Sequence, residues 1–124
     1  MNLVISSSSN LPIYEQIVRG IKDEIIKGNL KDGDALPSIR GLARDLQISI
    51  ITTNRAYEEL EKEGLIYSKA GKGFYVSEQN TNMLLEKKIQ GIESAIAELV
   101  KECKQSGLSK EDTLAMVGVI WDEK

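Results

Sequence analysis

Short hydrogen-bonding side chains gather between residues 49 and 55, and their types suit contact with nucleic acid. Hydroxyl, amide and guanidinium groups donate to phosphates and to base edges in the major groove. No acid occurs from Ser49 to Tyr57, whereas four glutamates follow between residues 58 and 63. Because carboxylates repel phosphates, this charge pattern predicts that the first part of the segment faces DNA. The predicted contacts are Ser49, Thr52, Thr53, Asn54 and Arg55.

Two further groups of residues have the same character. The segment from Tyr67 to Val76 contains no acid, and its centre reads Lys-Ala-Gly-Lys-Gly. Glycines let a backbone approach a duplex closely, and lysines neutralise phosphates. Upstream, two arginines lie four residues apart, a spacing that places both on one side of a helix. We therefore expect these groups to contact DNA through Ser38, Arg40, Arg44, Lys69, Gly71 and Lys72.

Catalytic and metal-binding chemistry find little support in the composition. The 124 residues include no histidine and one cysteine, so the commonest general base and the commonest metal ligand are missing. No two carboxylates occur at positions that the sequence would bring together for catalysis. We expect a protein that is not an enzyme, has no catalytic residues and needs no metal or cofactor.

The apolar spacing predicts three helices that would position these groups. The first runs from about Pro12 to Lys27, and the second is short and is capped by Ser38. The third runs from about Ile50 to Glu63 and buries Thr53 along with the apolar positions, although Thr53 is also a candidate contact. Two short helices separated by about three residues form a helix-turn-helix pattern.

A β-hairpin follows the third helix. Residues 65–68 and 74–77 are rich in aromatic and β-branched side chains, and the small, basic segment lies between them. This hairpin is the expected wing of a winged helix-turn-helix domain over residues 11–78, preceded by a flexible lead-in over 1–10. The predicted fold class is mainly α (α+β), because only two short strands are visible.

The C-terminal segment, residues 79–124, has the pattern of two amphipathic helices. Apolar residues spaced alternately four and three apart up to Cys103 follow an a/d heptad repeat, and Ser109 with Asp112 resembles a capping box for a last helix. Two helices of this size cannot enclose a core, so we expect a dimerisation domain. The alternative is packing onto the chain's own last helix and its first domain. The predicted dimer contacts are Leu85, Ile89, Ile92, Ile96, Leu99, Cys103, Leu114, Val117, Ile120 and Trp121.

Four segments resemble, in chain order, the winged-helix domain of the GntR family of bacterial transcription regulators. They are Pro12–Tyr14, Leu36–Arg40, Arg55–Ile66 and Gly71–Val76. The short two-helix tail resembles the YtrA-type subfamily, whose members dimerise through it and often repress neighbouring ABC-transporter genes. The resemblance implies DNA contacts by Arg40, Thr52 and Gly71. The chain departs from the family at Ile50 and Asn54, where many members carry arginine.

Composition and the resemblance together give the predicted function. The chain has 41% hydrophobic residues, a net charge of −3, no signal peptide and no apolar run of membrane-spanning length. We predict a cytoplasmic repressor that binds double-stranded operator DNA with inverted-repeat symmetry as a homodimer, without a membrane partner. No feature identifies a small-molecule effector. Two alternatives remain: a winged helix used for protein contacts without DNA, and a redox sensor that pairs Cys103 across the dimer.

Overall fold

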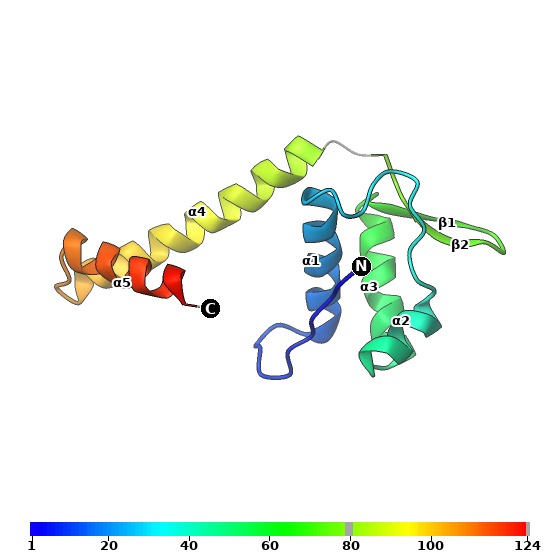
Figure 1. Ribbon diagram of the computed structural model, residues 1–124, viewed down its shortest axis with the longest axis horizontal. Helices are drawn as coiled ribbons and strands as arrows, with labels where there is room; N and C mark the ends of the chain where they lie inside the picture. The colour runs from blue at the N-terminus through cyan, green and yellow to red at the C-terminus, as the bar shows by residue number, and fades with distance from the viewer. Residues whose placement is uncertain (79–80, 124) are drawn as a thin grey trace. The chain divides into compact units, whose positions relative to one another are not determined.

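The computed structural model describes residues 1–78 and 81–123, which divide into two units, Met1–Leu84 and Leu85–Lys124. The predicted boundary after residue 78 adjoins residues 79 and 80, which lie outside the described residues. The first unit extends beyond that boundary because Leu84 packs against its hydrophobic core. Figure 1 labels the helices and strands of the two units.

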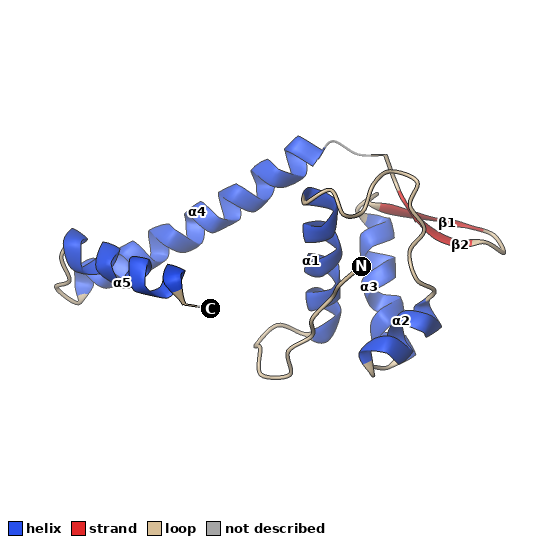
Figure 2. Ribbon diagram, in the orientation of Figure 1, coloured by secondary structure: helices blue, strands red, loops and turns tan. Residues whose placement is uncertain are grey.

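Three helices form the body of the first unit, as the apolar spacing predicts. They are α1 (Ile13–Ile26), α2 (Ile39–Leu46) and α3 (Ile50–Lys62), and α3 packs against both of the others (Figure 2). Their apolar faces meet in a core where Ile17, Ile21 and Leu60 are fully buried. The remaining buried apolar members of that core are Val18, Ile25, Leu30, Leu36, Leu42, Ala56, Tyr57, Leu65, Ile66 and Val76.

The predicted hairpin is present as β1 (Ile66–Lys69) and β2 (Gly73–Val76), paired antiparallel with Ile66 opposite Val76. Each strand lies one residue closer to the turn than predicted, because the Leu65 N–H closes the end of α3 on the Leu60 carbonyl at 3.0 Å. The segment 33–36 also pairs with β2, through a bridge between Ala35 and Tyr75. This third strand-like segment was not predicted.

The first ten residues, expected to be a flexible lead-in, make defined contacts. Leu3 and Ile5 are half-buried and pack against the core. The Ser6 N–H donates to Gln16 Oε1 at 2.8 Å, and Gln16 Nε2 donates back to the Ser6 carbonyl at 2.9 Å. The apolar alternation of Leu3 and Ile5, rather than the serine run that follows, explains the difference.

The second unit contains most of α4 (Thr81–Gln105) and all of α5 (Lys110–Asp122). The predicted capping box at the start of α5 is confirmed, because Ser109 Oγ accepts from the Asp112 N–H while Asp112 accepts from the Ser109 N–H. Across residues 85–123, only Cys103 and Thr113 are even half-buried. None of the helices in the described part of the chain has the length and apolar character of a bilayer-spanning segment.

Candidate DNA-binding surface

The turn between α2 and α3 is fixed by a cap at the start of each helix. Ser38 Oγ accepts from the Gly41 N–H at 2.9 Å, and Ser49 Oγ accepts from the Thr52 N–H at 3.0 Å. Between them, Gln47 takes a left-handed conformation with a φ of 57°. Side-chain caps of this kind satisfy backbone donors that helix geometry leaves unpaired. Both serines predicted to contact DNA therefore also begin helices.

Tyr57 connects α3 to the two elements beside it. Its hydroxyl donates to the Pro37 carbonyl at 2.7 Å, and its ring meets Phe74 of β2 edge to face, with centroids 5.0 Å apart. Because the side chain is fully buried, the pKa of the Tyr57 hydroxyl is raised well above its ordinary value. A neutral tyrosine thus holds α3 against the segment that enters α2 and against the wing.

The N-terminal end of α3 presents hydroxyl groups to solvent. Ser49 Oγ donates its proton to Thr52 Oγ1 at 2.7 Å, which leaves the Thr52 hydroxyl proton free for an outside acceptor. The helix dipole places partial positive charge at the same end. Exposed Ser49 and half-exposed Thr52 are therefore placed as a phosphate or base-edge contact requires.

Thr53 was predicted to contact DNA, but the structure buries its side chain in the core. Its side chain is 0% exposed, and its hydroxyl donates to the Ser49 carbonyl at 3.0 Å. The residue faces the same core as Ala56 and Tyr57, three and four positions further along the helix. Thr53 is a core residue, which is the alternative that its helical spacing left open.

Asn54 and Arg55 are each held by a neighbouring side chain. Asn54 Nδ2 donates to Glu58 Oε1 at 2.8 Å, one helical turn further on. The Arg55 guanidinium lies 3.9 Å from the centre of the Tyr14 ring on α1. A guanidinium over an aromatic face is attracted by the ring quadrupole and keeps its in-plane donors. Both side chains are thereby oriented while remaining at least half-exposed.

The wing carries its cations on an aromatic support. Tyr67 and Tyr75 stack across the two strands with centroids 5.8 Å apart, and Lys69 Nζ lies 4.8 Å from the centre of the Tyr75 ring. The Tyr75 hydroxyl and the Lys72 N–H both brace the turn, by bonds to the carbonyls of Lys72 and Lys69 respectively. Gly71 has a φ of +73°, a conformation that side chains disfavour. The predicted wing contacts Lys69, Gly71 and Lys72 are all exposed.

The two arginines of α2 are also exposed, as predicted. Arg44 Nε lies 3.9 Å from Asp45 Oδ1, and both side chains are more than two-thirds exposed, so this ion pair is weak.

Two glutamates at the C-terminal end of α3 interact with side chains of the same unit. Glu63 pairs with Lys22 at 2.9 Å, and Glu61 accepts from the Ser68 hydroxyl at 3.1 Å.

Two exposed isoleucines at the start of α3 were not among the predicted contacts. Ile50 is 44% exposed and Ile51 is 82% exposed, although α3 has an apolar core face. A signal for Ile51 was present in the sequence, because it lies outside the helical spacing of Thr53, Ala56, Tyr57 and Leu60. Ile51 therefore adds an exposed apolar side chain to the end of α3 that carries the hydroxyl groups.

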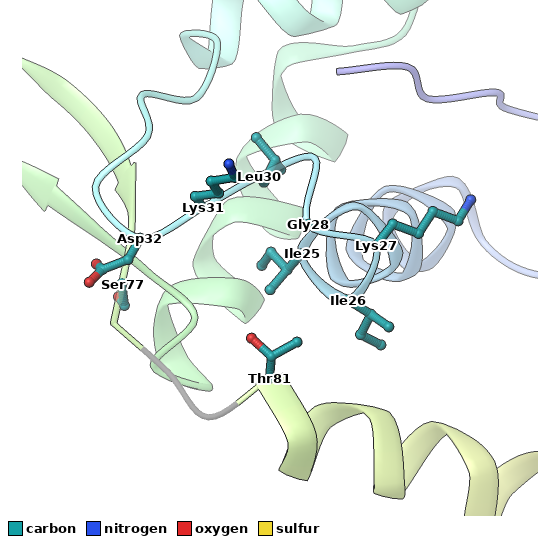
Figure 3. Close-up of a pocket in the computed structure, with 9 residues that line it drawn as sticks. All are labelled: Ile25, Ile26, Lys27, Gly28, Leu30, Lys31, Asp32, Ser77 and Thr81. Carbon is teal, nitrogen blue, oxygen red and sulfur yellow. The ribbon is translucent and has the colours of Figure 1, made fainter.

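A small pocket lies at the C-terminal end of α1, apart from the residues described above. It encloses about 250 Å³, is lined by residues 25–28 and 30–32 with Ser77 and Thr81, and includes none of the predicted DNA contacts (Figure 3). Small-molecule sites are larger, about 300–1,000 Å³. Within residues 1–78 and 81–123, no three acidic or cysteine side chains converge as a metal site.

Comparison with known proteins now assigns the chain to a family. Residues 13–76 match the model of the gntR family of bacterial regulatory proteins. The chain belongs to the GntR family. The HTH-type transcriptional repressor YtrA of Bacillus subtilis (strain 168) is 38% identical over 107 residues, which cover 86% of this chain and 82% of YtrA. This GntR-family protein is therefore of the YtrA type, as the two-helix tail predicts.

Solved structures agree with this assignment. A GntR family transcriptional regulator from Listeria monocytogenes is 36% identical, with a TM-score of 0.68 over 92% of this chain and 97% of that one. The predicted winged helix with a C-terminal helical region is therefore confirmed. The DNA-binding domain of AraR, solved in complex with operator ORX1, is 26% identical, with a TM-score of 0.56 over 62% of this chain and 99% of that one. The relatives are transcription regulators, not enzymes.

Proposed function

We propose that this GntR-family regulator is a repressor that binds an inverted-repeat operator as a homodimer. The observation that carries the proposal is the charge placement on the helix-turn-helix unit. The N-terminal half of α3 exposes hydrogen-bonding groups without an acid, and the wing exposes Lys69 and Lys72 on a braced turn. The first part of α3 enters the major groove, while Gly71 brings the wing backbone to the minor groove.

Phosphate contacts come from the elements that flank the recognition helix. Arg40 and Arg44 on α2 and the two wing lysines are exposed cations at the edges of the unit. Contacts of this kind set register and orientation without carrying sequence information. They also make affinity fall steeply as salt rises, because each neutralised phosphate releases counterions. AraR, a structural relative bound to operator DNA, supports the same use of the winged helix here.

The tail supplies the dimer. The a/d residues of α4, from Leu85 at 41% to Leu99 at 60%, are all substantially exposed in the single chain. Leucine and isoleucine at this heptad spacing pair with another helix, and a second copy of α4 offers the same face. On α5, Leu114, Val117, Ile120 and Trp121 are exposed in the same way and extend the surface. Two subunits related by a twofold axis then require an operator with two inverted half-sites.

Repression follows from occupancy. A dimer that covers a promoter competes with RNA polymerase for the same DNA, and no catalytic step is needed. For the regulated genes, the likeness to YtrA-type regulators favours an ABC-transporter operon.

Selection of bound sequences from a random DNA pool tests the proposal directly. With the purified full chain at modest salt, we expect recovery of an inverted repeat. A variant with Arg40→Ala and Lys72→Ala should recover little, whereas the matched variant Lys87→Ala and Lys101→Ala on α4 should recover the same motif. Absence of any motif, with the protein folded and dimeric, would exclude the proposal in favour of a protein-contact role.

A further inference from the structure

We propose that the recognition helix of this regulator reads A·T pairs. Asn54 contacts adenine, Ile50 and Ile51 contact the methyl groups of thymine, and Glu58 is a positioning residue for Asn54. The inference rests on the proposed function, since it concerns how the operator is read once α3 lies in the major groove. Three observations on α3 support it: the hydrogen bond of Asn54, the exposure of the two isoleucines, and the stacking of Arg55.

The amide of Asn54 is oriented by its partner. An ionised carboxylate only accepts hydrogen bonds, so the atom that faces Glu58 Oε1 at 2.8 Å has to be the amide nitrogen. This leaves one Nδ2–H and the carbonyl oxygen for an outside partner. A donor beside an acceptor matches N7 and the N6 amino group of adenine, which asparagine binds with two hydrogen bonds. Guanine offers two acceptors at that edge and leaves the Asn54 oxygen unpaired.

Ile51 is the most exposed large apolar side chain of α3, at 82%, and Ile50 beside it is 44% exposed. Neither belongs to the group of partly buried apolar residues that pack on the core. In the major groove, the one apolar group of a base-pair edge is the C5 methyl of thymine. Removing both the methyl group and the isoleucine from water stabilises the contact. These two residues therefore discriminate thymine from cytosine.

The one cation in the N-terminal half of α3, Arg55, is held by α1. Arg55 is the only lysine or arginine from Ser49 to Tyr57, and its guanidinium lies over the Tyr14 ring at 3.9 Å. A guanidinium reads guanine when its fork is free to meet O6 and N7 together. Stacked on α1, Arg55 instead offers in-plane donors to a phosphate. The base-reading end of the helix is thus left with amide and methyl groups.

The first experiment uses the operator recovered from the random pool. We expect A·T pairs at the positions under α3. Replacing the contacted thymines of one half-site by deoxyuridine, which lacks the methyl group, should weaken binding by wild type by about fourfold. The variant carrying Ile50→Ala and Ile51→Ala should bind the thymine operator more weakly and should be insensitive to the replacement. Equal sensitivity of wild type and variant would overturn the methyl contact.

The second experiment separates the role of Glu58 from its charge. Glu58→Gln and Glu58→Ala both remove a negative charge, but only glutamine retains an oxygen that accepts from Asn54. The measurement is discrimination, the ratio of affinities for operators with A·T or G·C at the adenine position. We expect about tenfold or more for wild type, near-normal discrimination for Glu58→Gln, and a clear loss for Glu58→Ala and Asn54→Ala. Equal discrimination by the glutamine and alanine variants would exclude positioning by Glu58.

The result also separates this inference from the proposed function. An inverted repeat with G·C pairs under α3, or one read through Arg55, leaves operator binding intact and overturns the A·T assignment. Recovery of no motif removes both. Recovery of an A·T-containing repeat that is insensitive to deoxyuridine and to Asn54→Ala points to readout of DNA shape and overturns the direct contacts.

Discussion

The two units of this regulator use similar amino acids with opposite results. In the winged-helix unit, leucine, isoleucine and tyrosine side chains such as Ile17, Tyr57 and Leu60 are removed from solvent completely. In the tail, isoleucines and leucines at equally regular helical spacing remain about half-exposed, and Trp121 is 84% exposed. Periodicity therefore shows which face of a helix must be covered, but the number of elements within reach decides whether the chain covers it by itself.

Length explains the contrast. Three helices and a hairpin surround a volume, whereas two helices, α4 and α5, present faces without enclosing one. Isolated helices draw little stability from propensity alone, so the tail gains most of its stability by packing. We therefore expect the first unit to behave as a folding unit and the tail to depend on a second subunit. Matched substitutions in the two units test that division.

A charge placed on the a/d stripe of α4 should have the largest effect. Ile96→Asp would bury a carboxylate between two subunits, so the protein should become monomeric and lose about 10² to 10⁴-fold in operator affinity, because the two half-sites are no longer bound together. Sedimentation and a binding titration measure the two effects. Ser94→Asp adds the same charge on the opposite side of α4 and should leave both unchanged. A dimeric Ile96→Asp variant would show that α4 does not form the interface.

The same substitution in each unit separates folding from assembly. Leu60→Ala empties a fully buried position and should lower the free energy of unfolding by about 2–5 kcal/mol. Leu99→Ala changes a side chain that is 60% exposed in the single chain, so it should raise the dimer dissociation constant by about tenfold or more.

Denaturant unfolding at several protein concentrations tests this pair. For the first unit, followed by the fluorescence of its tyrosines, the loss in Leu60→Ala should not depend on concentration. For wild type and Leu99→Ala alike, the unfolding midpoint should rise with protein concentration, but Leu99→Ala should need about tenfold more protein to reach the same midpoint, as mass action requires. If Leu99→Ala destabilised a monomer by the same amount as Leu60→Ala, the tail would have a core of its own and the comparison would fail.

Lysines in the two units should differ in their effect on salt dependence. Lys72 on the wing faces phosphate in the proposed complex, so Lys72→Ala should reduce the slope of log affinity against log salt by about two, one for each wing of the dimer. Lys101 lies on the side of α4 opposite the a/d stripe, and Lys101→Ala should leave the slope unchanged. Titrations of the operator at several salt concentrations supply the comparison. Equal slopes for both variants and wild type would remove Lys72 from the interface.

Most of the fold could be predicted from the sequence because its signals are local. Helical spacing, the serine caps and the capping box at Ser109 each depend on residues within a few positions of one another, and all three agree with the structure. The pairing of Ala35 with Tyr75 could not be predicted, since forty residues separate them and no pattern marks the contact. The core contact of Leu3 was missed for a different reason, because the serine run that follows it outweighed its alternation with Ile5.

The candidate site was predicted less completely than the fold. Residue type indicated which side chains can donate hydrogen bonds to DNA, but burial decides which of them reach the surface. Thr53 has a suitable hydroxyl and is fully buried. The contacts of Arg55 with Tyr14 and of Tyr57 with Pro37 join elements that are distant in sequence. The helical spacing indicated that Ile51 is exposed. An exposed isoleucine does not by itself indicate a contact, however, until the position of α3 in the fold is known. Which side chains this unit presents at its surface therefore depends on contacts between elements, which residue type alone does not show.

The smallest predicted effect concerns the buried hydroxyl of Tyr57, and it changes with pH. Tyr57→Phe removes the hydrogen bond to the Pro37 carbonyl and should cost about 1 kcal/mol near neutral pH. Burial raises the pKa of Tyr57 in the folded state, while the unfolded chain keeps the ordinary value of about 10. The unfolded state therefore loses this proton first as pH rises, and the stability of wild type falls relative to the variant. Paired unfolding curves should show the advantage of wild type vanishing by about pH 11. A difference that stays constant between pH 7 and pH 11 would mean that the hydroxyl ionises equally in both states, and that the first unit is more open at Tyr57 than its packing indicates.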